Sequence, residues 1–292
     1  MTRHTQDCHI NTLIAMRISA AESECTCEPI QQVWSCGGGT QSAAIAALIV
    51  RGKLPKPDIS VIADTGREAS ETWDYYDKVL YPELMKVGVE LHRIPHTYYP
   101  DVQPGYNTVD IYSGKDKDTI IMPMHTAQGG GILPKYCSNE WKSRPVDRFL
   151  REHGIKPPGE MWIGYSFDEQ GRCKSADALR AQAADNKLVH RYPLIEMGLR
   201  RQESIDIVES MGWGTPPRSA CWMCPYHNDQ EWKHLKSNYP KDFQKAVELE
   251  KELQKTDADV YFHKSLRPLS EAAFDEQGDM FDEPCASGMC FT

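Results

Sequence analysis

The sequence predicts an α/β protein in which a mostly parallel sheet carries helices on both faces. From about residue 31 onward, short β-type runs alternate with longer segments of helical pattern. This alternation is typical of βαβ units, whose strands lie parallel in one sheet. Hydrophobic residues make up 40% of the chain and charged residues 26%, as in ordinary globular proteins. The length of 292 residues fits two domains, or one large α/β domain with extensions.

The first half of the chain is expected to contain three strands and two helices before a long irregular connection. The strands are Gln32–Ser35, Asp58–Ala63 and Val89–Ile94, and the helices are Thr40–Arg51 and Ala69–Val87. From Pro95 to about Pro134 the periodicity is lost, and Pro, Gly and Asp are frequent. A connection of this length inside a compact domain usually serves as a lid or a binding loop.

Regular structure is expected to return in the second half of the chain. We predict helices over Ser138–Glu152, Lys174–Ala184 and Arg201–Met211, a strand over Gly159–Ser166, and a long charged helix over Asp229–Lys255. Three regions follow from this pattern: an arm over residues 1–30 with a short helix at Asn11–Ala21, a nucleotide-binding α/β domain over residues 31–215, and a C-terminal cysteine-containing helical region over residues 216–292.

Composition excludes several classes of protein. No run of 18 apolar residues exists, so no membrane span is expected, and the first residues are too polar for a signal peptide. We therefore expect a cytoplasmic protein, in which the ten cysteines serve metal binding or catalysis rather than disulfides. The net charge of −9 argues against a large nucleic-acid interface, although a local basic groove is compatible with it.

A glycine-rich turn joins the first expected strand to the first helix. The residues of this turn that we expect to contact a bound nucleotide are Ser35, Gly37, Gly38, Gly39, Thr40, Gln41 and Ser42. Glycines let a phosphate approach the backbone closely, and the N–H groups of a helix N-terminus attract anions. A plain strand-to-helix turn is the alternative, but one glycine would be enough for it. The turn therefore predicts phosphate binding.

A second cluster of polar residues follows the second expected strand. Asp64, Thr65 and Gly66 stand where this strand ends. Ligands of open α/β sheets bind beyond the carboxyl ends of the strands, so Asp64 is a candidate for holding Mg²⁺ or a ribose. The alternative is that Asp64 only caps the helix that follows.

Three cysteines far apart in the sequence form the candidate metal site. Cys221 and Cys224 make a C-x-x-C motif, and Cys137 lies 84 residues upstream. A closed zinc site made by Cys221, Cys224, Cys285 and Cys290 is one interpretation, and an iron–sulfur cluster is the other. The spacing alone does not distinguish them.

Several of these segments together resemble one superfamily. Ser35–Ser42 resembles the pyrophosphate loop of the ATP pyrophosphatases, or adenine nucleotide alpha hydrolases (PP-loop), and Ile62–Thr72 resembles the "DTG" segment of the phosphoadenylyl-sulfate reductase branch. Met161–Arg172 and Arg191–Leu194 resemble later segments of that branch. The resemblance extends over about two thirds of the chain and implies the adenine nucleotide alpha hydrolase-like fold.

The resemblance also implies roles for individual residues. The loop would hold the β- and γ-phosphates of ATP, with Gly164 among the nucleotide contacts. Three cations, Lys142, Arg144 and Arg172, would act catalytically on the triphosphate. In adenylyl-sulfate reductases, a cysteine pair followed by Lys-x-x-Pro joins a C-x-x-C motif to hold a 4Fe–4S cluster. Cys137 matches the first cysteine of that pair, and Ser138 replaces the second. The fourth ligand is then Cys285, or one iron is open.

The expected function is cleavage of ATP into pyrophosphate and AMP or an adenylated acceptor, within an iron–sulfur-dependent sulfur-transfer or nucleic-acid modification step. The cofactors are ATP, Mg²⁺ and a 4Fe–4S cluster, with Zn²⁺ as the alternative. Acceptors include tRNA, DNA or a small molecule, with a sulfur donor protein and a homodimer as possible partners. Compact relatives occur in phages and mobile elements.

Two other functions remain open. A sulfonucleotide reductase is disfavoured because the C-terminal residues lack the Glu-Cys-Gly-x-His segment of such enzymes. A non-catalytic nucleotide-binding protein with structural zinc is the third interpretation.

Overall fold

The computed structural model describes residues 30–98, 111–113, 119–127 and 131–274. The expected helix at Asn11–Ala21 lies outside these residues. The chain forms two compact units. The described part of unit 1 comprises residues 30–62, 75–94 and 146–218, and that of unit 2 comprises the remaining described residues. Residues 63–74 and 95–145, which we had placed in the α/β domain, thus group with the residues after 218.

Unit 1 is built on a five-stranded sheet. Its strands are β1 (Gln31–Cys36), β2 (Ile59–Asp64), β3 (Leu91–Pro95), β8 (Gly159–Ile163) and β9 (Val189–Arg191), in the spatial order β3-β2-β1-β8-β9. β1 is parallel to both β2 and β8, and β8 is parallel to β9. The register places Cys36 beside Ile62 on β2 and Ser35 beside Ile163 on β8. The predicted α/β fold with a mostly parallel sheet is confirmed.

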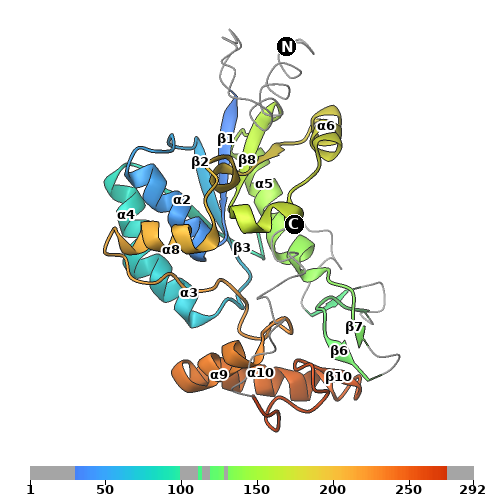
Figure 1. Cartoon of the computed structure of the whole chain (residues 1–292). Coiled ribbons are helices and arrows are strands. Elements are labelled where there is room, and N and C mark those ends of the chain that lie inside the picture. The colour runs from blue at the N-terminus through green and yellow to red at the C-terminus, as the bar shows by residue number, and fades with distance from the viewer. Residues whose placement is uncertain (1–29, 99–110, 114–118, 128–130, 275–292) are drawn as a thin grey trace. The chain divides into compact units, whose positions relative to one another are not determined.

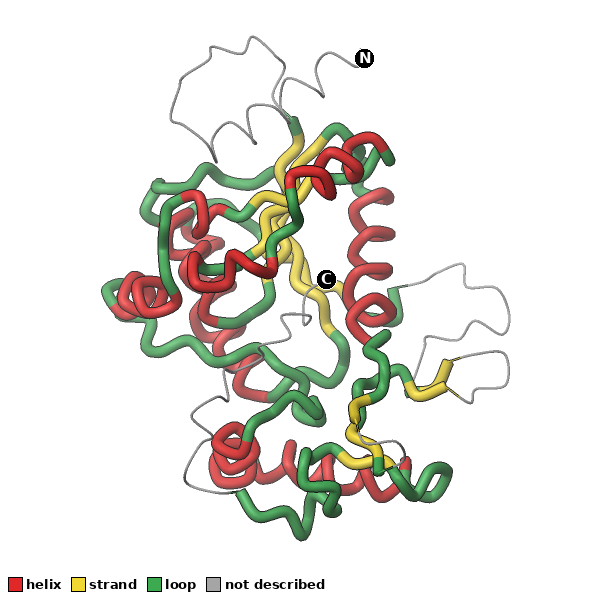
Figure 2. Tube along the Cα trace, turned by 45° about the vertical axis from the view of Figure 1, so that its right-hand side comes forward, coloured by secondary structure: helices red, strands yellow, loops and turns green. Residues whose placement is uncertain are grey.

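Helices cover both faces of this sheet. The helical segments of unit 1 are α2 (Thr40–Val50), a π-helical turn (Tyr76–Leu80), α4 (Tyr81–Lys86), α5 (Arg144–Glu152), a 3₁₀ turn (Phe167–Arg172), α6 (Ala176–Ala184), α7 (Pro193–Glu196) and α8 (Arg201–Glu209). α2, α4 and α8 lie on one side of the sheet and α5 on the other (Figures 1 and 2). Because α8 packs against α2, the apolar helix α2 is buried on nearly all sides, from Ala43 to Ile49.

Unit 2 combines helices with short strands. Its elements are α3 (Ser70–Tyr75), β4 (Tyr112–Ser113), β5 (Thr119–Ile120), β6 (His125–Thr126), β7 (Gly131–Ile132), a π-helical turn (Asn139–Ser143), α9 (Asp229–Asn238), α10 (Pro240–Leu253) and β10 (Val260–Tyr261). β6 pairs antiparallel with β7 and β10. The core of unit 2 contains Met122, Trp141, Trp232 and Phe262, each at most 2% exposed.

A buried carboxylate closes the last part of unit 2. Glu250 on α10 is 1% exposed. Its Oε1 accepts the Phe262 N–H at 2.7 Å, and its Oε2 accepts the Leu269 N–H at 2.5 Å. Burial raises the pKa of this carboxyl group, while the two N–H donors act in the opposite direction. The Glu250 carboxylate therefore provides the hydrogen-bond acceptors for two backbone N–H groups in the segment after α10.

Two expectations for individual elements were wrong. The single helix over Asp229–Lys255 breaks at Tyr239, because Pro240 disfavours helical backbone at the preceding residue and Tyr239 has φ −128° and ψ 58°. The predicted helix over Ala69–Val87 is present from Ser70 to Lys86, as α3, the π-helical turn and α4 in uninterrupted succession. The stretch Pro95–Pro134 holds β4 to β7 in its described part and contributes Met122 to the core.

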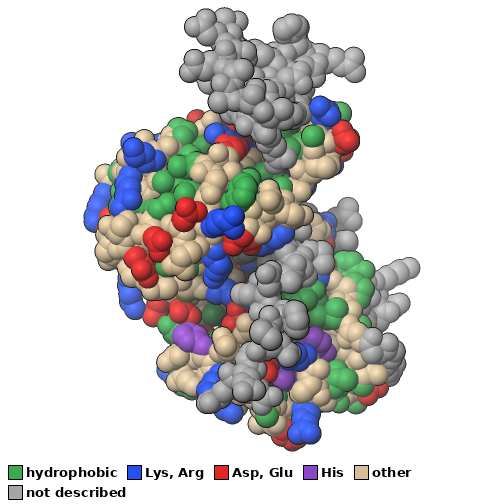
Figure 3. Space-filling model, in the orientation of Figure 1, with side chains coloured by type: hydrophobic (Ala, Val, Ile, Leu, Met, Phe, Trp, Pro, Cys, Tyr) green, Lys and Arg blue, Asp and Glu red, His purple; other side chains and the backbone are tan. Residues whose placement is uncertain are grey.

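None of the described helices is long and apolar enough to cross a membrane. On the face of the molecule shown in Figure 3, the described basic and acidic side chains are intermixed.

Candidate functional site

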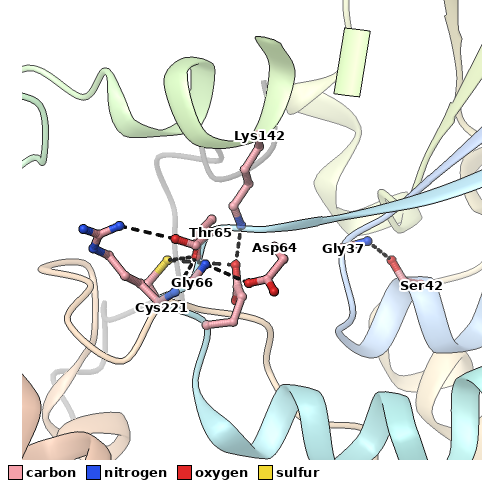
Figure 4. Close-up of polar contacts among 9 residues, drawn as sticks. Gly37, Ser42, Asp64, Thr65, Gly66, Lys142 and Cys221 are labelled. Carbon is pink, nitrogen blue, oxygen red and sulfur yellow. Dashed lines mark hydrogen bonds and ion pairs between the residues drawn. The ribbon is translucent and has the colours of Figure 1, made fainter. Parts of the chain in front are cut away.

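The glycine turn lies between β1 and α2 in unit 1. Gly38 has φ +79°, a left-handed conformation that favours glycine, and Gly39 caps the helix in an extended conformation. The Ser42 hydroxyl, on a residue only 5% exposed, accepts the Gly37 N–H at 2.7 Å (Figure 4). Ser42 therefore braces the turn from inside the first turn of α2.

The turn places a helix N-terminus directly after a strand. The Ala43 N–H donates to the Gly39 carbonyl at 2.9 Å, which is the first hydrogen bond of α2. An α-helix leaves the N–H groups before that point without intrahelical acceptors, and its dipole gives this end a partial positive charge. The backbone from Gly39 to Ser42 can therefore hold an anion.

The glycine turn lies at the position in the sheet where ligands of open α/β folds usually bind. β1 is flanked by β2 on one side and by β8, which comes much later in the chain, on the other. The strand order thus reverses at β1, and open α/β sheets bind ligands beyond the carboxyl ends of the strands at such a switch point. The glycine turn follows the carboxyl end of β1 itself.

Gly164, which directly follows β8, lies against the start of α2. A Cβ atom at this position would lie 3.3 Å from the Gln41 Cβ and 3.5 Å from the Ser42 backbone nitrogen. The first contact is tighter than ordinary van der Waals distance, so the absence of a side chain allows β8 and α2 to approach. Among the predicted nucleotide contacts, Gly164 and the glycine turn are therefore brought together within unit 1.

Arg172 is linked to the same helix through Glu169. Its Nη1 donates to Glu169 Oε1, and its guanidinium lies 4.2 Å from the centroid of the Tyr165 ring. Glu169 Oε2 in turn accepts the Gln41 side-chain amide at 2.8 Å. Arg172, the predicted catalytic arginine, is thus connected to Gln41 of the glycine turn through the Glu169 carboxylate. No role for Glu169 was predicted from the sequence.

Cys36, at the end of β1, is a structural thiol. Its side chain is 4% exposed, and burial raises its pKa to about 12, with hydrogen bonds from the Gly38 backbone and the Ser42 side chain acting in the opposite direction. A thiol with this pKa stays protonated near neutral pH and is a poor nucleophile. Cys36 therefore packs beneath the turn. Ser35 precedes Cys36 on β1, and Thr40, which is 3% exposed, begins α2 on the other side of the turn.

A second site lies in unit 2, where the three predicted thiols line one cavity of about 50 Å³. Cys137 comes from the segment before the π-helical turn, and Cys221 and Cys224 come from the loop after residue 218. The walls of this thiol cavity also include Lys135, Lys142, Ser138, Trp141, Met122 and Tyr226. The structure thus brings Cys137 together with the C-x-x-C motif that begins 84 residues later, at Cys221.

Burial controls the protonation of these thiols. It raises the pKa of Cys221 well above its ordinary value, and the Glu68 carboxylate adds to this effect. Burial also raises the pKa of Cys137, against the charges of Lys135 and Lys142. Both thiols therefore retain their protons near neutral pH, and a metal that binds them would have to displace these protons.

The segment after β2 contacts a residue that lines the thiol cavity. The Thr65 Oγ1 lies 3.6 Å from the Cys221 Sγ, as Figure 4 shows. The Gly66 N–H donates to Asp64 Oδ1 at 2.7 Å, which closes a local turn at φ +68° for Gly66. Asp64 thus closes a turn directly after β2, several residues before α3 begins at Ser70. A carboxylate at this position can also hold Mg²⁺.

Two predicted phosphate-binding cations are bound to carboxylates in unit 2. The Lys142 Nζ lies 2.8 Å from Glu68 Oε1, and the two side chains are 18% and 3% exposed. The Arg144 Nη1 lies 2.7 Å from Glu140 Oε2, with the Arg144 side chain 41% exposed. Lys142 therefore belongs to the wall of the thiol cavity, and Glu68 is a buried partner that sequence reasoning missed.

The thiol cavity offers three potential metal ligands, the thiols of Cys137, Cys221 and Cys224. Within the described ranges, no three His, Cys, Asp or Glu side chains are arranged to hold a single metal ion. Cys285 lies outside those ranges. Thiolates of an iron–sulfur cluster bind different irons, so they surround a group larger than one ion. Three soft donors around one cavity fit such a cluster better than a single closed zinc ion.

Two solved structures are examples of the known proteins that this chain resembles. One is the U34-tRNA thiolase NcsA from Methanococcus maripaludis with its 4Fe–4S cluster, at 14% identity over 85% of this chain and 80% of that chain, with a TM-score of 0.41. The other is the phosphoadenylyl-sulfate reductase from Candida auris in a phosphate complex, at 14% identity over 76% of this chain and 96% of that chain, with a TM-score of 0.42. No family model matches the sequence, and no curated protein matches it.

Proposed function

We propose that this chain cleaves ATP between its α- and β-phosphates and transfers the adenylate to an acceptor. The observation that carries this proposal is the glycine turn at the point of the parallel sheet where the strand order reverses. Gly38 has a left-handed backbone there, and the N-terminus of α2 follows it. Both features suit a polyphosphate better than a neutral ligand.

The residues of unit 1 have distinct roles in this reaction. Backbone N–H groups of the turn bind the β- and γ-phosphates, and Ser42 keeps the turn in shape through Gly37. Arg172 stabilises negative charge that develops on the leaving pyrophosphate, and its planar guanidinium suits a phosphate group. Because Glu169 and Tyr165 hold Arg172, the cation is preorganised and loses little freedom when the nucleotide binds.

The residues of unit 2 carry the remaining expected roles. Asp64 supplies a carboxylate for Mg²⁺, which neutralises the polyphosphate. Cys137, Cys221 and Cys224 would hold the 4Fe–4S cluster, which would organise the sulfur that displaces AMP. We propose tRNA or DNA as the macromolecular acceptor, with a sulfur donor protein as partner.

The identity of the first product tests the ATP reaction. The purified full chain should release pyrophosphate rather than orthophosphate from ATP and Mg²⁺. Ser42→Ala should slow this release at least tenfold, because it leaves the Gly37 N–H without its acceptor and loosens the turn.

Ser204→Ala is the matched control. Ser204 is a fully buried serine of unit 1, and its hydroxyl donates to the Arg200 carbonyl at 3.0 Å. Each substitution removes one hydrogen bond to the backbone, at a cost of about 1–3 kcal/mol, but only Ser42→Ala alters the turn. Orthophosphate as the first product would contradict the proposed cleavage.

The metal in the thiol cavity needs a separate measurement. Protein prepared without oxygen should be brown and absorb near ~400 nm, as iron–thiolate chromophores do. A colourless chain that binds one zinc ion would instead support the non-catalytic interpretation.

A further inference from the structure

Glu68 is a buried carboxylate beside the thiol cavity whose second oxygen the surrounding structure leaves unexplained. The residue is 6% exposed. Its Oε1 lies 2.8 Å from the Lys142 Nζ and 3.9 Å from the Cys221 Sγ. Its Oε2 is fully buried and has no hydrogen-bond partner among the described residues. Such an oxygen in a native structure usually indicates an ion, a water molecule or a catalytic role.

The backbone fixes this carboxylate relative to the thiol loop. Glu68 forms an antiparallel bridge with Cys221. On either side of this bridge, the Trp222 N–H donates to the Arg67 carbonyl at 2.9 Å and the Ala69 N–H donates to the Ala220 carbonyl at 3.0 Å. These bonds hold the two segments in register, so Glu68 and Cys221 form one preorganised pair of potential ligands.

The hydrogen bonds of Glu68 match those of a metal-binding carboxylate. Metal ligands are usually oriented by a second hydrogen bond to the atom that does not bind the metal. Lys142 provides this bond at Oε1, which leaves Oε2 as the available donor atom. Carboxylate oxygen also binds iron and zinc in proteins, although it is harder than a thiolate.

The number of cysteine ligands also favours Glu68 as a metal ligand. Three thiols line the cavity, and the position beside Cys137 is occupied by Ser138, whose neutral hydroxyl is a weak ligand. A carboxylate would supply a fourth anionic donor and keep the ligand charge of a four-cysteine site. On this basis we infer that Glu68 is the fourth protein ligand of the cluster. The inference rests on the proposed function, in which Cys137, Cys221 and Cys224 bind iron.

The test measures iron and acid-labile sulfide in the full-length protein prepared without oxygen, together with its visible and electron paramagnetic resonance spectra. Glu68→Gln should lose at least half of the iron, or convert the cluster to a three-iron form. Two control variants should keep the wild-type iron content. Cys285→Ser removes the alternative ligand, and Glu71→Gln changes a half-buried carboxylate of the same segment, which contacts His234 at 3.2 Å.

A double variant separates ligation from stability. Adding Ser138→Cys to Glu68→Gln supplies a thiolate from another wall of the cavity and should restore the iron, even though the Lys142 ion pair stays broken. Unchanged iron in Glu68→Gln, loss of iron in Cys285→Ser, or failure of this rescue would overturn the inference. Absence of iron in the wild-type protein would instead overturn the iron–sulfur part of the proposed function.

Discussion

Gly38 offers the sharpest test of the glycine turn, because the same helix provides its control. Gly38 precedes α2 and has φ +79°, and Gly52 follows α2 and has φ +67°. A Cβ atom at Gly52 would meet nothing within 4 Å. Replacing either glycine by alanine forces a left-handed backbone on a residue with a side chain, at a cost of about 1–2 kcal/mol. Both variants should therefore lose stability, seen as decreases in melting temperature.

Only Gly38→Ala should also weaken ATP binding. If the variant loses one hydrogen bond between a backbone N–H and a charged phosphate, the cost is about 1.5–3 kcal/mol. That cost corresponds to roughly a 10- to 150-fold higher dissociation constant. Calorimetric titration with ATP and Mg²⁺ measures it directly, with the rate of pyrophosphate release as a second readout. Equal ATP affinity in the two variants would refute the assignment of the turn to phosphate binding.

Three further predictions concern other parts of the chain. Glu250→Ala should lower the free energy of unfolding by about 2–6 kcal/mol, because two buried N–H groups lose their acceptor. Glu248→Ala, at an exposed position of the same helix, should change it little. Equal losses for the two variants in urea denaturation would contradict this reasoning. Burial, together with the charge of Lys174, lowers the pKa of His190 from 6.5 to about 4. Between pH 6.5 and pH 4 the imidazole is therefore protonated in the unfolded chain but not in the folded one. The free energy of unfolding should fall by about 3 kcal/mol as the pH drops through this range. His190→Gln should reduce that loss between urea midpoints measured at pH 7 and pH 4.5, and an unchanged loss would exclude this histidine as its source. Arg172→Lys should slow pyrophosphate release by about tenfold or more with little change in melting temperature, because lysine lacks the planar fork, and a wild-type rate would remove this arginine from the mechanism.

The sequence was most informative where structure depends on local chemistry. The turn before α2 was predictable because consecutive glycines and a helix start occupy neighbouring positions. The parallel sheet was predictable from alternating strands and helices. The break at Tyr239 also has a signal in the sequence, because Pro240 stands inside the predicted helix Asp229–Lys255, but the prediction ran the helix through it.

Contacts between distant residues could not be predicted in this way. Lys142 looked like a cation for phosphate, but its ion-pair partner Glu68 lies 74 positions away in the sequence. The bridge from Glu68 to Cys221 spans 153 positions. Such pairings depend on how the loops of unit 2 fold together, and a single charged residue carries no sign of its partner. The resemblance to a known superfamily indicated the thiols but not this carboxylate.

The interleaving of the two units has a consequence for how the protein is made. β1 is synthesised early, but Gln31 on β1 pairs with Gly159 on β8, so the nascent strand must wait for that later segment to leave the ribosome. Folding that depends on such distant pairings is slow. A fragment that ends near residue 215 would complete the sheet but lack most of the core of unit 2. Recombinant work should therefore use the whole chain, and chaperone dependence during expression is the expected cost of this connectivity.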